Sequence, residues 1–154
     1  IYEYTEFWEI FLNGNNLFDY KVQSDYDEKN RSAFHAFSHV NTFNSALELY
    51  KQTGNNKYLD LSVYFHQWLD ESQRIATGGY GVNLEHLLER DKLIDLLGTV
   101  TNSYETQCGA YAIVTVDNRL LSYTGDAHYG NWTEDAFYNM TIASLETRDG
   151  AAHY

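Results

Sequence analysis

Apolar side chains recur three and four residues apart between residues 39 and 54, which is the spacing of one face of an α-helix. The stretch reads HVNTFNSALELYKQTG, and its apolar positions are Val40, Phe43, Ala46, Leu47 and Tyr50. A glycine, Gly54, comes at its end, and glycine readily adopts the left-handed conformation that follows many helices. The pattern therefore predicts a helix that ends at Thr53-Gly54-Asn55.

More helices are predicted after this turn. The stretch KYLDLSVYFHQWLDESQ has the same periodicity, with Leu59, Val63, Phe65 or His66, and Leu69 on one face. The pattern then predicts a short helix in ERDKLIDLLGTV, a longer one from about Cys108 to Tyr123, and another in YGNWTEDAFYNMTIASL. The chain has no proline, which agrees with helices because proline interrupts their hydrogen bonds. The predicted fold class is all-α.

Two segments of the chain resemble each other. ALELYKQTGNNKYLD (46–60) and DNRLLSYTGDAHYGN (117–131) share a Thr-Gly pair followed by Asn or Asp, and the offset from Thr53 to Thr124 is 71 residues. A tyrosine, Tyr58 or Tyr129, follows each threonine by five positions. Each segment predicts a helix, a tight turn and a second helix. Repeated helical hairpins assemble into bundles, solenoids or closed (α/α) toroids.

The composition is that of one acidic domain. The chain has 154 residues and a net charge of −12 with histidine neutral. Nucleic acids and anionic membrane surfaces attract clustered Lys and Arg, so neither is an expected partner. There is no apolar run long enough to predict a membrane span. The single cysteine excludes an intrachain disulfide and leaves the compartment undecided; the oligomeric state is equally undecided.

Aromatic residues are abundant, with 14 Tyr and three Trp. These side chains combine an apolar face with a polar tip. They suit a site that stacks sugar rings, and they suit the amphipathic edge of a core equally well. A carbohydrate is therefore a candidate ligand on composition alone.

The first group of candidate site residues lies in FHAFSHVN and consists of His35, His39 and Asn41. Histidines four residues apart share a helix face and can ligate a metal. However, the glutamate of the metalloprotease pattern is absent between them. The alternative, with one histidine exposed and one packed, is ordinary for this residue type. We keep all three as candidate substrate-binding residues.

The second group lies in the glycine-rich loop ATGGYGVNLEHLL, residues 76–88. Its glycines indicate a sharp turn or a close approach to another group. We expect Tyr80 at the tip of the loop as a substrate-binding residue, and Glu85 as a general acid near aromatic side chains. The alternative is a structural loop in which Glu85 begins the next helix, where the helix dipole favours a negative charge.

The third group lies in TNSYETQCGAYA. Asn102 or Ser103 is expected to cap a helix, with Glu105 in its first turn and Cys108 on the same face. A thiolate at a helix N-terminus is stabilised and reactive, whereas the alternative is a buried structural cysteine beside a capping glutamate. Tyr104 is a further candidate substrate-binding residue.

The segments ATGGYG with a following Glu, SYETQCGAYA, LLSYTGDAHYGNWTEDAFYN and ASLETRDG, taken in this order, resemble glycoside hydrolase family 127, the β-L-arabinofuranosidase-like proteins. SHVNTFNSALELYKQTGNNKYLDL also resembles this family's histidine-containing helix and Thr-Gly turn. The resemblance covers about residues 33 to 150. It implies that the single domain 1–154 forms part of an (α/α)6-type toroid, because a complete toroid contains more helix than this chain supplies.

The resemblance also implies roles for individual residues. Glu85 is similar in position to the family's general acid/base. In the family, a Glu-x-Cys motif binds zinc together with two adjacent cysteines further along, one of which is the nucleophile. Here Glu105 and Cys108 are three residues apart, and the chain has no adjacent cysteine pair. Cys108 is thus a candidate zinc ligand in an incomplete ligand set, and Glu105 is a second candidate acid or base.

Three functions follow as hypotheses. A glycoside hydrolase acting on a polysaccharide or oligosaccharide side chain would need two carboxyl groups, about 5 Å apart for retention or roughly 6.5–9.5 Å for inversion, and Glu85 with Glu105 is the candidate pair. A polysaccharide lyase on a similar toroid would use His39, Asn41 and Tyr80 around a uronate. A non-catalytic helical module that binds sugar or protein is the third. The hydrolase is favoured.

Overall fold

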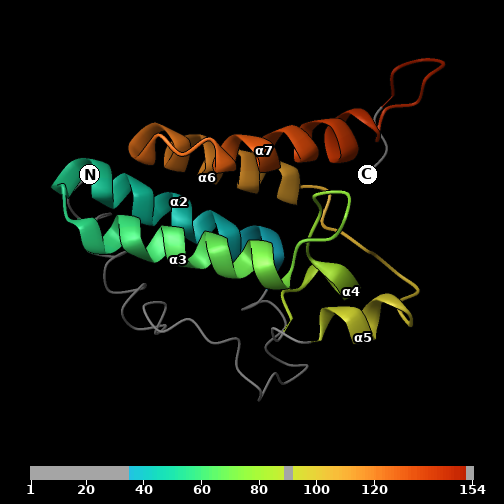
Figure 1. The fold of residues 1–154 in the computed structure, drawn as a ribbon. Coiled ribbons are helices and arrows are strands. Elements are labelled where there is room, and N and C mark those ends of the chain that lie inside the picture. Colours follow the sequence, from blue (N-terminus) through green and yellow to red (C-terminus); the bar gives the residue numbers. More distant parts are fainter. Residues whose placement is uncertain (1–34, 89–91, 152–154) are drawn as a thin grey trace.

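The fold is described from a computed structural model, for residues 35–88 and 92–151. This part of the chain is all-α, as predicted (Figure 1). The elements in chain order are α2 (Ala36–Thr53), α3 (Asn56–Ser72), α4 (Val82–Glu85), α5 (Leu93–Leu97), α6 (Gly109–Thr124), α7 (His128–Asp135) and a π-helix, η3 (Ala136–Ile142). The predicted domain also includes residues 1–34, which lie outside the described residues.

Two long helical hairpins form the body of this fold. α2 and α3 form the first hairpin and α6 and α7 the second, and α6 packs against both α2 and α7. Figure 1 shows both Thr-Gly turns at one end of the helices, whereas the glycine-rich loop, α4 and α5 lie at the other end. The hairpins lie side by side, which confirms the predicted packing of helical hairpins and is consistent with a part of an (α/α)6-type toroid.

The repeated Thr-Gly turns have the same hydrogen bonds in both hairpins. Gly54 (φ 66°) and Gly125 (φ 73°) are the left-handed residues that end α2 and α6. In each turn the threonine hydroxyl donates to a carbonyl four residues earlier, and the next side chain, from Asn55 or Asp126, accepts a backbone N–H two residues later. The sequence repeat is therefore a structural repeat, and Thr-Gly-Asn/Asp encodes the turn.

The core lies between the two hairpins. Phe43 of α2 and Phe65 of α3 stack with ring centroids 3.6 Å apart and an angle of 4° between the rings. Trp132 of α7 is completely buried. Its ring and that of His66 are arranged edge to face, with centroids 5.1 Å apart. Both repeat tyrosines, Tyr58 and Tyr129, are also buried in this core. This rigid body supports the loops at the glycine-rich end.

One predicted helix start is wrong. Asn102 or Ser103 was expected to cap a helix, but α6 begins at Gly109 and Cys108 is its N-cap residue. The side chains of Asn102 and Ser103 bind the backbone of Leu84 instead. The amide and hydroxyl that favour a helix cap serve here to hold another loop, which the local sequence does not reveal. In the described ranges, no helix is long and apolar enough to cross a membrane.

Candidate active site

The glycine-rich loop packs tightly against three other segments. A β-carbon on Gly79 would lie 2.1 Å from Oε2 of Glu105, and one on Gly81 would lie 2.1 Å from Oγ1 of Thr106 and 2.9 Å from Cβ of Ala36. The indole N–H of Trp132 donates to the carbonyl of Gly78 at 2.7 Å. The loop thus lies against the start of α2, the segment before α6, and α7, and its glycines are required for this close approach.

Tyr80 lies in the core rather than at the tip of the loop, so its expected placement is corrected. The side chain is completely buried, and its hydroxyl donates to the carbonyl of Gly109 at 2.9 Å. Its own carbonyl accepts the N–H of Thr106 at 2.7 Å. Burial raises the pKa of Tyr80 well above its ordinary value, so the phenol stays neutral. The reason for this placement is that the ring anchors the loop to the beginning of α6.

The last three residues of α4, directly before His86, form a left-handed turn rather than a right-handed helix. Asn83, Leu84 and Glu85 have φ values of 62°, 62° and 64°, a conformation that costs non-glycine residues about 1–2 kcal/mol each. The linker before α6 holds this turn. The N–H of Asn83 donates to the carbonyl of Ser103 at 2.9 Å, and the N–H of Leu84 donates to the side chains of Asn102 and Ser103. Such strain is typical of functional sites.

Glu85 meets His35 at the end of this turn. Nε2 of His35 and Oε2 of Glu85 are 2.9 Å apart, and the two side chains are 30% and 32% exposed. His35 directly precedes α2, and its backbone pairs with that of His86 in an isolated antiparallel bridge. The predicted site residues His35 and Glu85, 50 positions apart, are thus brought together at a site that solvent can reach.

The other two residues of the first group lie on α2. His39 is partly buried, with its ring 5.9 Å from that of Phe65 and 6.1 Å from that of Phe43. Asn41 is partly buried and accepts a hydrogen bond from the Asn44 side chain at 3.1 Å. His39 therefore packs beside the core, one helical turn from His35. Both remain candidate substrate-binding residues.

Glu105 and Cys108 lie in the segment that leads into α6. Oε2 of Glu105 accepts a hydrogen bond from Oγ1 of Thr77 at 2.8 Å, so this carboxylate is held against the glycine-rich loop. Cys108 is a free, partly buried cysteine. Tyr104 is about half exposed, and its hydroxyl donates to the carbonyl of Val100 at 3.1 Å. Gln107 binds the carbonyl of Met140, which connects the segment to η3.

The zinc that the family resemblance implies needs a set of convergent ligands. Within residues 35–88 and 92–151, no three His, Cys, Asp or Glu side chains converge in a way that could hold a metal ion. Glu105 and Cys108 supply two suitable ligand types but not a complete set. These residues alone do not fit a zinc site.

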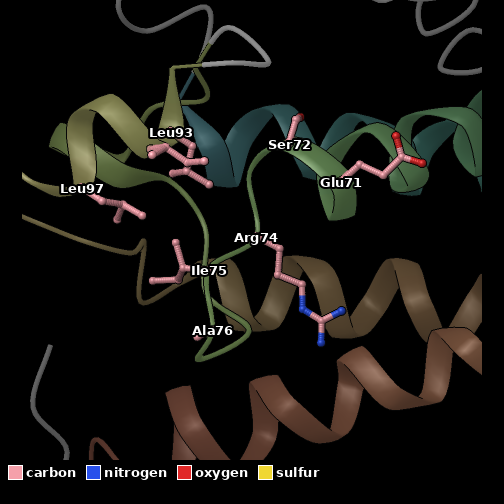
Figure 2. A pocket seen from close by; sticks show the side chains of 8 residues that line it. Glu71, Ser72, Arg74, Ile75, Ala76, Leu93 and Leu97 are labelled. Atoms are coloured by element: carbon pink, nitrogen blue, oxygen red, sulfur yellow. The ribbon is translucent and has the colours of Figure 1, made fainter.

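A separate hollow of about 560 Å³ opens beside the beginning of the glycine-rich loop. Figure 2 shows Ile75, Leu93 and Leu97 near one another, whereas the guanidinium of Arg74 extends toward α7. That guanidinium bonds to Asp70 and Asp135 and lies over the ring of Trp132 at 4.8 Å. The lining residues include none of the candidate site residues. The hollow is therefore distinct from the Glu85 site.

Some residues that build the site were not identified from the sequence. Thr77 donates a hydrogen bond to the carboxylate of Glu105, and Thr106 lies against Gly81. Asn102 and Ser103 hold the left-handed turn. Asn102 and Ser103 were expected only as helix caps, and Thr77 and Thr106 gave no periodic or motif signal. The closely spaced glycines were the one available sign that other groups would approach this backbone.

The described part of the chain belongs to the class of all-α proteins built from packed helical hairpins, with carboxylates on the loops at one end. Loops that a packed scaffold positions are where binding and catalytic residues are commonly found. A family model described as "Beta-L-arabinofuranosidase, GH127 catalytic domain" matches residues 24–154. Because the match covers most of the chain, the chain belongs to glycoside hydrolase family 127. Searches of curated proteins and of solved structures find no match to the chain.

Proposed function

We propose that this protein hydrolyses a glycosidic bond in an oligosaccharide or polysaccharide side chain, with Glu85 as the general acid/base. The observation that carries the proposal is the setting of Glu85. Its side chain is about one-third exposed, its Oε2 lies 2.9 Å from Nε2 of His35, and it belongs to the glycine-rich loop of residues 76–88. A general acid must be accessible to the substrate yet fixed in direction, and this setting meets both requirements.

The strained turn supports the same role. Three consecutive left-handed residues are unfavourable, and they persist because Asn102 and Ser103 bind their backbone. A relaxed helical turn at residues 83–85 would give Glu85 a different direction. Strain that is maintained by specific contacts is common where a reactive group must be aimed. The position that the turn gives to the Glu85 carboxyl group thus explains why a strained conformation is retained.

Glu105 is the candidate second carboxylate of the reaction. It flanks the glycine-rich loop, and its Oε2 accepts a hydrogen bond from Thr77. One oxygen is thereby engaged with the loop, which fixes the direction of the carboxylate. In a hydrolase it would stabilise positive charge on the sugar ring or orient a water molecule.

The lyase hypothesis is less well supported. Its phenolic acid or base would be Tyr80, which is completely buried and whose hydroxyl donates to Gly109. A group that must reach a proton on the substrate cannot act from that position. The binding-module hypothesis offers no reason for the strain at residues 83–85. Hydrolysis remains the function that the geometry of Glu85 favours.

Product analysis tests the proposed reaction. The intact protein is incubated with a panel of furanosides and pyranosides, including β-L-arabinofuranosides, in water enriched in ¹⁸O. Hydrolysis releases a free sugar and places ¹⁸O in one of the two products. An unsaturated product that absorbs ultraviolet light would mean elimination instead, and binding without release of any sugar would mean a non-catalytic module. Either result would contradict the proposal.

A further inference from the structure

The His35–Glu85 contact has a defined geometry on the histidine side. His35 has φ −59° and ψ 120° at the residue before α2, and its carbonyl accepts the N–H of His39 at 2.9 Å. Its backbone also pairs with His86, and the two imidazole rings meet edge to face at 6.1 Å. The next residue, Ala36, is fully buried against Gly81. The backbone of His35 is therefore fixed by its contacts with His39 and His86 and by the buried Ala36, which limits where the imidazole can lie.

The two ring nitrogens of His35 have different environments. Nε2 faces Glu85, whereas Nδ1 is buried and has no hydrogen-bond partner in the described part of the chain. An orphaned buried N–H is rarer than an orphaned acceptor. The proton of a neutral imidazole therefore belongs on Nε2, from which it is donated to Oε2 of Glu85. The contact made by one nitrogen thus fixes the tautomer of the whole ring.

We propose that His35 is a positioning residue for Glu85, in that its neutral imidazole donates from Nε2 to Oε2 and leaves Oε1 to exchange the catalytic proton. This inference rests on the proposed function. As the glycosidic C–O bond breaks, the proton on Oε1 passes to the departing oxygen. During turnover the oxygen of a water molecule becomes bonded to the anomeric carbon, and a proton of that water restores the acid. His35 keeps its own proton throughout. Its effect is to fix which oxygen of Glu85 faces the leaving group.

Two substitutions separate this role from direct binding of the sugar. His35→Phe keeps an aromatic ring but removes the donor, whereas His35→Gln keeps an N–H donor close to the position of Nε2. Each variant is assayed on a pair of glycosides of one sugar, one with an alkyl leaving group that needs acid assistance and one with a dinitrophenyl leaving group that does not. Circular dichroism and the unfolding midpoint establish that each variant is folded.

The expected result is selective. His35→Phe lowers kcat for the alkyl glycoside by roughly 10–100-fold, the size of effect that misplacement of a reacting group produces, while KM and the rate on the dinitrophenyl glycoside change little. His35→Gln recovers most of the loss. If His35 binds the sugar, KM rises for both substrates, and this result would overturn the proposal. Equal losses of kcat on both substrates would overturn it as well.

A measurement without substrate tests the positioning role of His35 separately from the proposed hydrolase function. In ¹⁵N-labelled protein, nuclear magnetic resonance should find His35 protonated at Nε2 and not at Nδ1, and Glu85→Ala should alter the Nε2 signal alone. Protonation at Nδ1 would overturn the positioning role even if the protein is a hydrolase. Wild-type protein that cleaves no glycoside would remove the proposed function, and the positioning role with it, although the tautomer was as expected.

Discussion

Nε2 of His66 and Oδ1 of Asp117 lie 2.7 Å apart, and the two side chains are only 2% and 0% exposed. The pair joins α3 of the first hairpin to α6 of the second. Thr133 of α7 donates to the other carboxylate oxygen of Asp117 at 3.4 Å. This polar pair connects three helices at the centre of the core, because Asp117 of α6 contacts both His66 of α3 and Thr133 of α7.

Removing one member of this pair should be strongly destabilising. His66→Leu leaves the Asp117 carboxyl buried without its main partner, and we expect the free energy of unfolding to fall by about 3–5 kcal/mol in urea denaturation. Glu48→Gln is the control, because Glu48 pairs with Arg119 at 3.1 Å on a more exposed surface. Such a surface pair contributes up to about 1 kcal/mol. Similar losses in both variants would contradict this account of the core.

The same pair should give stability a specific pH dependence. Burial raises the pKa of Asp117 above its ordinary value of 3.8, and the hydrogen bond and charge of His66 oppose this effect. Because the native pKa is raised, the native state binds this proton more readily than the unfolded chain does. The stabilisation that the raised pKa of Asp117 contributes to the folded state is therefore complete below pH 3.8. It is lost as the pH rises through the native pKa.

Comparison with Asp117→Asn isolates that contribution, since asparagine does not titrate. The free energy of unfolding is measured by urea denaturation for both proteins, from below pH 3.8 upward through the native pKa of Asp117. We expect the stability of wild type relative to Asp117→Asn to decrease as the pH rises. A difference that stays constant or increases with pH would contradict the raised pKa.

Gly81 should be the least replaceable glycine of the loop. It has φ 86°, and a β-carbon there would meet both Thr106 and Ala36. We expect Gly81→Ala to lower the free energy of unfolding by at least about 2 kcal/mol, because strain and overpacking add. Gly130→Ala in α7 is the matched control: its β-carbon would enter open space, and alanine stabilises a helix interior by about 0.5–1 kcal/mol. Thermal denaturation of both variants gives the comparison.

The strain at residues 83–85 can be tested at Leu84, whose side chain is 44% exposed. Glycine adopts the left-handed conformation without penalty, so Leu84→Gly should raise the free energy of unfolding by up to about 1 kcal/mol. Ile94→Gly in α5 removes an even more exposed side chain from a right-handed helix, and there glycine should destabilise by about 1 kcal/mol. Equal losses in the two variants would show that the turn is not strained.

The sequence predicts the hairpins well because their determinants are local. Apolar periodicity located α2, α3 and α6, and Gly54 and Gly125 end their helices as expected. The region between the hairpins is different. Neither Leu84 nor Glu85 favours a left-handed turn, so this conformation depends on distant contacts. The side chain of Asn102 was available for a helix cap but binds that turn instead.

The candidate site was predicted only in part, for the same reason. The glycines indicated close approach, and Gly79 and Gly81 do contact other segments. However, Tyr80 was expected at the loop tip, whereas its side chain is buried and its hydroxyl donates to the carbonyl of Gly109. His35 and Glu85 were both named as candidates, but 50 residues separate them. Their direct contact could be found only once the fold was known.

The role of Glu85 is the central claim, and the most direct test is the kcat/KM of Glu85→Gln on an alkyl glycoside that the wild-type protein cleaves. Glutamine keeps the size and the hydrogen-bonding capacity of the side chain but cannot exchange the catalytic proton. We expect a loss of about 10²–10⁴-fold, with an unchanged unfolding midpoint and with no loss in Glu134→Gln, an exposed control on α7. A Glu85→Gln variant that retains wild-type kcat/KM would contradict the account.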